Sequence, residues 1–347
     1  MISLENVEKI YQTQQREIHA LRGVSLLVEA GEIFGIIGRL AAGKSTLLRC
    51  INLVEKPTHG KVIVDNCDLT ALENKSLHIA RRSMGMISQH PNLLNSRSVF
   101  NNIALPLELV GTPKIEIEQI VHPLLTFIGL AEKANAYPAE LTEIQKHRVA
   151  LARALVLTPK VLLCDEPTAL MDSKTTHSFL QLLKEVNEHF NLTIVIFTSD
   201  MEVIKSLCHR VAVLHHGKIV EQNTVTELYA NPQSQLCKDL IKTTSRLELP
   251  LTLRKRLRPH PNENSNPVVR MSFIGANAEE ALIAYVIQQF NLMINIMQAH
   301  VEKIQEEHIG IMIAEITGDS HNINQALEFL AGKNLYIEVL GHATRAA

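Results

Sequence analysis

The sequence lacks any pattern of cysteines that could hold a metal ion or form a disulfide framework. Its five cysteines, Cys50, Cys67, Cys164, Cys208 and Cys237, are widely spaced, and no two of them form a Cys-x-x-Cys pair. Cysteines spaced in this way usually serve as small buried apolar residues. We therefore expect neither a cysteine-based metal site nor a set of disulfides.

Long hydrophobic runs and an excess of charge of one sign are also missing. No apolar run reaches the length of a membrane-spanning helix, and the first residues show no basic segment followed by an apolar one. The formal net charge is −2, which gives no reason to expect a nucleic acid as a partner. We expect a soluble, cytoplasmic chain that needs a membrane-spanning partner for any role at a membrane.

The 347 residues, of which 46% are hydrophobic and 20% charged, suffice for two or three packed domains. Prolines and asparagines without apolar periodicity gather between residues 244 and 267, which is typical of a linker. The basic run 254–258 within it fits either a solvated surface or a contact with phospholipid or an acidic partner. We predict one domain over 1–245, a linker over 246–267 and a second domain over 268–347.

The strongest signal in the sequence is a phosphate-binding loop. Two glycines with four residues between them precede Lys44 and Ser45, with a short apolar run before them and a helix-prone segment after them. Such a turn points backbone N–H groups at an anion, and the helix N-terminus adds positive potential. We predict that Lys44 reaches the terminal phosphates of a nucleoside triphosphate and that Ser45 holds Mg²⁺. The residues expected around the nucleotide are Gly38, Arg39, Leu40, Ala41, Ala42, Gly43, Lys44, Ser45 and Thr46.

A second signal is a pair of carboxylates at the end of a buried strand. The continuous apolar run 161–164 suits a strand of a parallel sheet, and Asp165 and Glu166 follow it directly. Hydrolysis of ATP needs one carboxylate near Mg²⁺ and another that polarises the attacking water. We predict the first role for Asp165 and the second, catalytic role for Glu166.

Two further residues could complete a nucleotide site. Gln89 follows the apolar segment 84–87 and could offer its side-chain oxygen to Mg²⁺ and sense the γ-phosphate. Tyr11 lies in the first strand region and could stack on adenine. A plain surface loop would also explain Gln89, and only its occurrence together with the two motifs above favours the role at Mg²⁺. Core or surface packing would explain Tyr11 equally well.

The order of apolar segments predicts the fold class. Strands that alternate with helices up to about residue 215 predict an α/β fold with a mainly parallel sheet. Between 97 and 155 the pattern is helical, with breaks expected at Pro106, Pro123 and Pro138. After the linker, the order strand, helix, strand, strand, helix, strand predicts a ferredoxin-like α+β domain. Its sequence shows neither a catalytic nucleophile with a general base nor a cluster of ligand-binding residues.

Residues 1–245 resemble the ATP-binding subunit of an ABC transporter. The matching positions are Tyr11, 38–46, Gln89, 141–155 and 162–168. The opening residues 1–7, the segment 84–87 and the C-terminal domain narrow the resemblance to methionine-importer ATPases.

This resemblance implies a P-loop NTPase core of the ABC ATPase type, with an antiparallel β subdomain and a helical subdomain, followed by the ferredoxin-like domain. It implies ATP and Mg²⁺ as cofactors, with Ser45, Gln89 and Asp165 around the metal. It also implies a homodimer, transmembrane permease subunits as partners, and a peripheral position on the cytoplasmic face of the inner (plasma) membrane. In this family the C-terminal domain binds methionine and inhibits transport when that amino acid is plentiful.

The sequence departs from the family at the signature motif, Leu-Ser-Gly-Gly-Gln, which closes over the ATP of the partner subunit. Thr142, Glu143 and Ile144 replace its central residues. Thr142 keeps a hydroxyl, but Glu143 places a negative charge near a polyanion, and like charges at about 4 Å cost about 4 kcal/mol at an effective dielectric constant of 20. Ile144 adds a branched side chain where backbone must approach closely.

Other departures lie at the γ-phosphate and in the phosphate loop. Ser199 occupies the place of the family's switch histidine and cannot carry a positive charge. Leu40 and Ala41 replace the usual Ser-Gly, and Ala41 is strained by about 1 kcal/mol if its φ is positive.

We therefore predict a chain of the importer ATPase lineage that binds nucleotide and hydrolyses ATP weakly or not at all. One alternative is a fully active ATPase that energises methionine import. The other is an amino-acid-sensing scaffold with little affinity for nucleotide.

Overall fold

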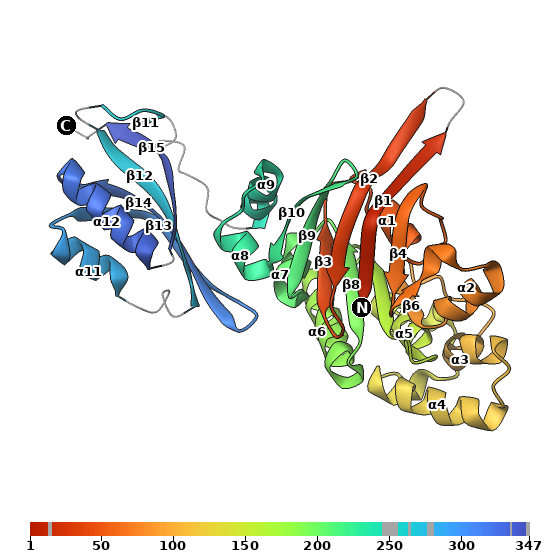
Figure 1. The fold of residues 1–347 in the computed structure, drawn as a ribbon. Helices are drawn as coiled ribbons and strands as arrows, with labels where there is room; N and C mark the ends of the chain where they lie inside the picture. Colours follow the sequence, from red (N-terminus) through yellow and green to blue (C-terminus); the bar gives the residue numbers. More distant parts are fainter. Residues whose placement is uncertain (13–15, 245–255, 263–264, 276–280, 334, 345–347) are drawn as a thin grey trace. The chain divides into compact units, whose positions relative to one another are not determined.

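The computed structural model describes residues 1–12, 16–244, 256–262, 265–275, 281–333 and 335–344. The chain divides into two compact units, Met1–Gln222 and Asn223–Ala347. Figure 1 labels most helices and strands of both units. Among the described residues, no helix combines the length and the apolar character that crossing a bilayer requires.

The first unit is built on a mostly parallel sheet with the strand order β10-β9-β3-β8-β7-β6. Its strands are β3 (Ile33–Ile37), β6 (Met84–Ile87), β7 (Val161–Asp165), β8 (Thr193–Thr198), β9 (Arg210–His215) and β10 (Lys218–Thr224). β3 pairs in parallel with β8 and β9, and β7 pairs in parallel with β8 and β6. Every residue of β3 and β8 is buried, as expected for the continuous apolar runs of a sheet covered on both faces. The predicted α/β fold is confirmed.

An antiparallel sheet lies beside this core, as the sequence predicts. Its order is β2-β1-β4-β5, with β1 (Ile2–Gln12), β2 (Glu17–Val28), β4 (His59–Val64) and β5 (Cys67–Asp68). Helix α1 (Lys44–Ile51) shares one hydrophobic core with both sheets, because Leu47 and Leu48 pack with Ile2 of β1 and with Phe197 of β8. This shared core fixes the first turn of α1 against the ends of the parallel strands.

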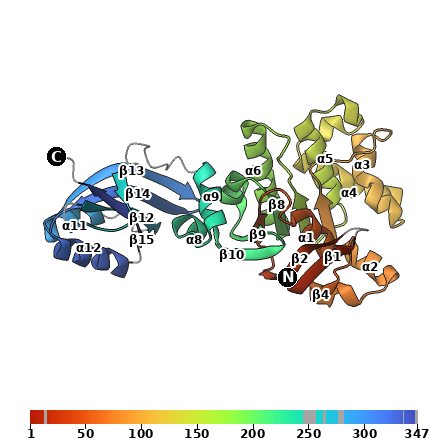
Figure 2. The same cartoon turned by 90° about the horizontal axis from the view of Figure 1, so that it is seen from above.

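Helices α2 (Asn74–Arg81), α3 (Val99–Leu109), α4 (Lys114–Phe127) and α5 (Glu143–Leu155) follow, with short 3-10 turns at Leu69–Ala71, Ala131–Lys133 and Pro138–Glu140. In both views α3, α4 and α5 gather in one group (Figures 1 and 2). Helices α6 (Ser173–Phe190) and α7 (Met201–Leu207) complete the first unit.

The helix breaks predicted at Pro106 and Pro123 are wrong, because both prolines lie inside helices. A proline costs a helix one backbone hydrogen bond. In α3 the buried Ile103 and Leu107 flank Pro106, so tertiary packing outweighs that cost. In α4 the residue four positions before Pro123, Gln119, is exposed, and its carbonyl can turn to water.

The second unit begins with α8 (Val225–Ala230) and α9 (Gln235–Thr244) and continues into a sheet of order β11-β15-β12-β14-β13. The strands are β11 (Leu257–Arg258), β12 (Ser265–Ile274), β13 (Met293–Ile304), β14 (Glu307–Thr317) and β15 (Tyr336–Thr344). Helices α11 (Leu282–Gln289) and α12 (Ser320–Gly332) pack on it through Val286, Ala326 and Leu330. The predicted strand, helix, strand, strand, helix, strand order is confirmed.

Part of the predicted linker belongs to this sheet. Leu257 and Arg258 pair with β15, and β12 begins at Ser265, before the expected start of the domain. Asn266 is buried, and its amide donates to Glu315 at 2.8 Å and to Thr317 at 3.0 Å. A buried amide that is satisfied in this way anchors the strand although its composition is typical of a loop. Residues 245–255, which include the start of the basic run, lie outside the described residues.

Candidate functional site

A cavity of about 650 Å³ opens at the carboxyl ends of β3, β7 and β8. It brings together most of the predicted nucleotide residues. Those that line it are Arg39, Leu40, Ala41, Ala42, Gly43, Lys44, Ser45, Thr46, Gln89, Asp165, Glu166 and Ser199. In doubly wound α/β folds, ligands bind at this edge of the sheet.

The loop between β3 and α1 needs its glycines for steric reasons. A Cβ atom on Gly38 would lie 2.5 Å from the Leu214 carbonyl oxygen. Gly43 has a φ of 109°, and its Cβ would lie 2.7 Å from the Ala20 carbonyl oxygen. Since neither clash can be relieved by a flexible side chain, these positions accept only glycine.

The replaced loop residues behave differently from each other. Ala41 has a φ of 62°, so it adopts the left-handed conformation for which strain was expected, at a cost of about 1 kcal/mol. Leu40 is 95% exposed at the tip of the loop. It therefore presents an apolar side chain at the mouth of the cavity.

Lys44 is buried and already bound within the loop. Its Nζ donates to the Gly38 carbonyl oxygen at 2.7 Å and lies 3.4 Å from a carboxylate oxygen of Glu166. A phosphate in the cavity would compete with Glu166 for this ammonium group. The position fits a cation that reaches an anion over the loop.

Glu166 adopts a positive φ of 46° directly after β7. One of its carboxylate oxygens accepts from the Thr198 hydroxyl and from the Ser199 backbone N–H, both at 3.2 Å. The Ser199 hydroxyl lies 3.5 Å from the same oxygen. The end of β8 thus fixes this carboxylate, while Ser199 supplies no charge toward the cavity.

The residues predicted to hold Mg²⁺ fit a divalent cation. Burial and the neighbouring carboxylate of Glu166 raise the pKa of Asp165 above its usual range, and Lys44 only partly opposes this. Lys44 and Arg49 thus offset the burial of this carboxylate only in part, and a metal ion would add positive charge that favours its ionised form. Ser45 and Gln89 line the same cavity and offer the oxygen ligands that Mg²⁺ prefers. Within the described ranges, no group of three or more His, Cys, Asp or Glu residues forms another metal site.

Tyr11 lies outside the residues that line this cavity. Its hydroxyl donates to the carboxylate of Glu55, and the Lys9 ammonium lies 5.1 Å from the centre of its ring. Burial and the hydrogen bond to Glu55 raise the pKa of Tyr11. Its predicted stacking on adenine stays a prediction.

The signature residues also lie away from the cavity and form the start of α5. Thr142 caps the helix, because its hydroxyl accepts from Gln145 N–H at 3.4 Å and the Gln145 side chain accepts from Thr142 N–H at 2.9 Å. Glu143 pairs with Lys146 at 2.6 Å, which holds the pKa of Glu143 below its usual range. This carboxylate is therefore charged at neutral pH. Ile144 is half-buried.

Other residues that line the cavity were not predicted from the sequence, among them His19, Arg22 and His216. They come from β2 and from the turn between β9 and β10. Gly217 joins them to the loop, since its N–H donates to the Ala42 carbonyl and its carbonyl accepts from Arg22 N–H, both at 2.9 Å. No local pattern in the sequence signals this long-range contact.

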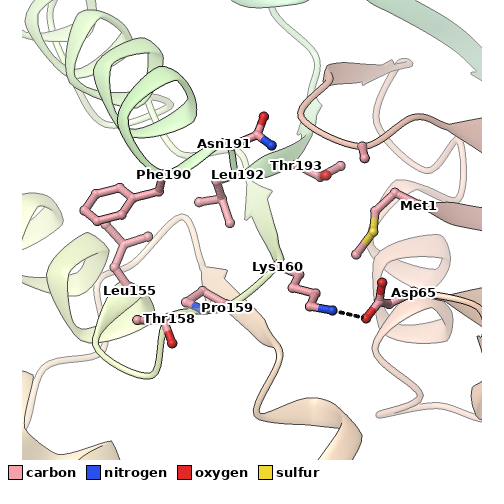
Figure 3. A pocket seen from close by; sticks show the side chains of 11 residues that line it. Met1, Asp65, Leu155, Thr158, Pro159, Lys160, Phe190, Asn191, Leu192 and Thr193 are labelled. Carbon is pink, nitrogen blue, oxygen red and sulfur yellow. Dashed lines mark hydrogen bonds and ion pairs between the residues drawn. The ribbon is translucent and has the colours of Figure 1, made fainter.

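A second cavity of about 390 Å³ lies at the opposite, amino-terminal ends of β7 and β8. Figure 3 shows Phe190 and Leu155 on one side of it and the ion pair between Lys160 and Asp65, at 2.5 Å, on the other. It contains none of the predicted nucleotide residues. The first cavity is therefore the candidate site.

Comparisons with known proteins find matches in both units of the chain. The family model for ABC transporters matches residues 21–169, and the model for the NIL domain matches residues 267–339. The methionine import ATP-binding protein MetN of Vibrio cholerae serotype O1 is 45% identical over 342 residues, which cover 99% of both chains. The chain belongs to the MetN family of ABC transporter ATP-binding proteins. MetN 3 of Pectobacterium atrosepticum is 46% identical over 342 residues, which cover 99% of this chain and 100% of that one.

Solved structures agree with the MetN assignment at the level of the ATPase unit. The ATP-binding cassette MJ0796, solved as a dimer in a post-hydrolysis state with ADP and Pi, is 34% identical, with a TM-score of 0.60 over 65% of this chain and 99% of that one. The structure of cbiO1 from Clostridium perfringens, part of the complex cbiONQ, is 30% identical, with a TM-score of 0.62 over 71% of this chain and 95% of that one. The ABC ATPase fold is confirmed.

Proposed function

We propose that this chain is the ATP-binding subunit of an ABC importer for methionine and that it binds Mg-ATP in the cavity at the carboxyl ends of the parallel strands. The observation that carries this proposal is that one cavity gathers Lys44, Ser45, Gln89, Asp165 and Glu166 from distant segments. The name of the MetN relatives supports methionine as the transported amino acid.

Each residue has a distinct task in this proposal. Backbone N–H groups of residues 38–45 cradle the phosphates, and Lys44 leaves Glu166 to bind the terminal ones. Ser45, Gln89 and Asp165 hold Mg²⁺, which offsets the charge of the phosphates. Glu166, once freed from Lys44, orients the attacking water.

We further propose that this chain hydrolyses ATP weakly or not at all. The charged Glu143 side chain would face the phosphates held by a second copy, and the dimeric state of the related MJ0796 cassette supports such a pairing. Ser199 hydrogen-bonds Glu166 and adds no positive charge for the γ-phosphate. Without these groups, nucleotide binding is kept while stabilisation of the transition state is lost.

The proposed domain boundaries, sensing domain and partners are those that membership of the family suggests. We propose an ATPase domain over 1–245, a connecting segment over 246–267 and an amino-acid-sensing domain over 268–347 that binds methionine. The importer would comprise two copies of this chain with transmembrane permease subunits, on the cytoplasmic face of the inner membrane. The apolar side of the sheet under α11 and α12 supports a separately packed sensing domain.

The deciding experiment is Mg-ATP turnover by the purified full chain. It is compared with Glu166→Gln and with a restored variant that carries Thr142→Ser, Glu143→Gly, Ile144→Gly and Ser199→His. We expect the chain to match the Glu166→Gln background and the restored variant to exceed both by about 100-fold or more. Turnover by the unchanged chain well above background would identify an active importer ATPase. Failure to bind Mg-ATP would favour a sensing scaffold.

A further inference from the structure

Two side chains of α5 hold the loop that follows Gln89. The His147 ring is buried, with Nε2 3.2 Å from the Gln89 carbonyl oxygen and Nδ1 2.9 Å from the Glu143 carbonyl oxygen. Further along the helix, the Arg153 guanidinium donates to the carbonyls of Pro91 at 2.8 Å and of Asn92 at 3.0 Å. One helix thus meets the backbone of this loop at successive points.

The loop from residue 88 to residue 98 contains no regular helix or strand. Its second half is held by Asn102 of α3, which hydrogen-bonds the backbone of Leu94 and Arg97. In its first half, Pro91 has no N–H to donate. Asn92 has a positive φ of 50°, which turns the chain sharply.

The carbonyls of Gln89, Pro91 and Asn92 only accept hydrogen bonds. Arg153 donates to the last two, and His147 donates to the first in the tautomer that carries the proton on Nε2.

We propose that His147 and Arg153 are positioning residues that clamp residues 89–92 to α5 and so place the side chain of Gln89 in the cavity. This inference rests on the proposed function, in which Gln89 is a ligand of Mg²⁺. The clamp couples the helix that starts with the signature residues to the metal side of the nucleotide site. A shift of α5 then moves Gln89 with it.

A packing role for His147 makes a different prediction. Its ring meets Phe179 of α6 edge-on, with the ring centres 5.9 Å apart. A leucine at 147 would keep that apolar contact and lose the donor, whereas a glutamine would keep a donor for the Gln89 carbonyl. His147→Leu and His147→Gln therefore separate the two roles. His122→Leu on α4 is the matched control, since His122 is exposed and its ring packs on Phe100.

The first test is Mg²⁺ binding to the full chain saturated with ATP, measured by isothermal titration calorimetry beside ATP binding in EDTA. His147→Leu should weaken Mg²⁺ binding about fivefold to tenfold and change ATP binding in EDTA less than about twofold. His147→Gln should recover the Mg²⁺ affinity, and His122→Leu should keep it. The clamp would be overturned if His147→Leu weakened ATP binding in EDTA as much as it weakened Mg²⁺ binding. It would also be overturned if His147→Gln bound Mg²⁺ as weakly as His147→Leu.

The second test needs no nucleotide. Amide hydrogen exchange of peptides that cover residues 88–97 should be about fivefold faster in His147→Leu than in the unchanged chain, and restored in His147→Gln. Unchanged exchange overturns the clamp itself. If exchange responds while Gln89→Ala leaves Mg²⁺ affinity intact, the clamp stands and the metal role of Gln89 in the proposed function fails.

Discussion

At the scale of single residues, two residues of the phosphate loop, Ala41 and Leu40, lower the stability of the folded chain. Ala41 has a positive φ that favours glycine, and Leu40 beside it exposes an apolar side chain to water. Neither residue is needed for the backbone path, because Gly38 and Gly43 make the close approaches to neighbouring backbone. The loop therefore keeps its shape at the expense of stability.

Ala41→Gly should stabilise the chain by up to about 1 kcal/mol, because it removes the strain of a left-handed alanine. The free energy of unfolding from urea titration measures this. Ala42→Gly is the matched control, since Ala42 is buried and its φ is not positive, so this change should destabilise by about 0.5–1 kcal/mol. A loss of stability in both variants would contradict the assigned strain.

Tyr11→Phe should separate stability from nucleotide binding. The hydrogen bond from Tyr11 lowers the pKa of Glu55 more than the hydrogen bond from the neighbouring Arg49 does. A carboxylate with a lowered folded-state pKa contributes stability above its unfolded value of about 4.3, and that contribution is lost as pH falls through the folded pKa.

We therefore expect Tyr11→Phe to cost about 1 kcal/mol at pH 7 and progressively less below about pH 4, in urea titrations at several pH values. Phenylalanine can still stack on adenine, so ATP affinity should stay within about twofold. Tyr137→Phe serves as a control, since Tyr137 is 49% exposed, and it should change neither quantity. A pH-independent loss would rule out the bond to Glu55 as its cause.

At the scale of elements, the altered signature residues stabilise the start of helix α5 but disfavour a contact with the phosphates of ATP. Thr142 and Gln145 form a capping box, and Glu143 adds a negative charge at the positive end of the helix. The family's glycines would give the helix neither of the side chains at 143 and 144. The replacements thus strengthen the element while they obstruct the proposed contact with phosphate.

Glu143→Gly together with Ile144→Gly should therefore lower the free energy of unfolding by about 1–2 kcal/mol, through helix propensity and the lost ion pair with Lys146. Thermal unfolding monitored by circular dichroism tests this. Thr142→Ser alone keeps the cap and should stay within about 0.5 kcal/mol. If the double glycine variant is as stable as the unchanged chain, α5 gains nothing from its altered start.

The elements also show what could be predicted from the sequence. Buried strands and the glycine-rich turn have local signals, so β3, β7 and the turn from β3 into α1 were predicted correctly. The helix breaks predicted at Pro106 and Pro123 were wrong because tertiary packing outweighs helix propensity there. The linker was predicted to extend past Asn266 because the hydrogen-bond partner of Asn266, Glu315, is distant in sequence. The same distance hid His216 and the contacts of α5 with the Gln89 loop.

At the scale of the whole molecule, the two compact units have separate hydrophobic cores, with that of the second built between its own sheet and α11 and α12. Every residue of the proposed nucleotide site belongs to the first unit. A ligand stabilises only the unit that binds it, by about 2.7 kcal/mol at a concentration 100-fold above its dissociation constant. Nucleotide should therefore act on the two units unequally.

Differential scanning calorimetry of the full chain should show one transition that moves several degrees upward with Mg-ATP and another that does not move. In Lys44→Ala, which removes the cation beside Gly38 and Glu166, Mg-ATP should leave both transitions in place. A single transition that shifts as a whole would mean that the units unfold together. The absence of any shift in the unchanged chain would argue for the sensing scaffold, because hydrolysis is not required for this stabilisation.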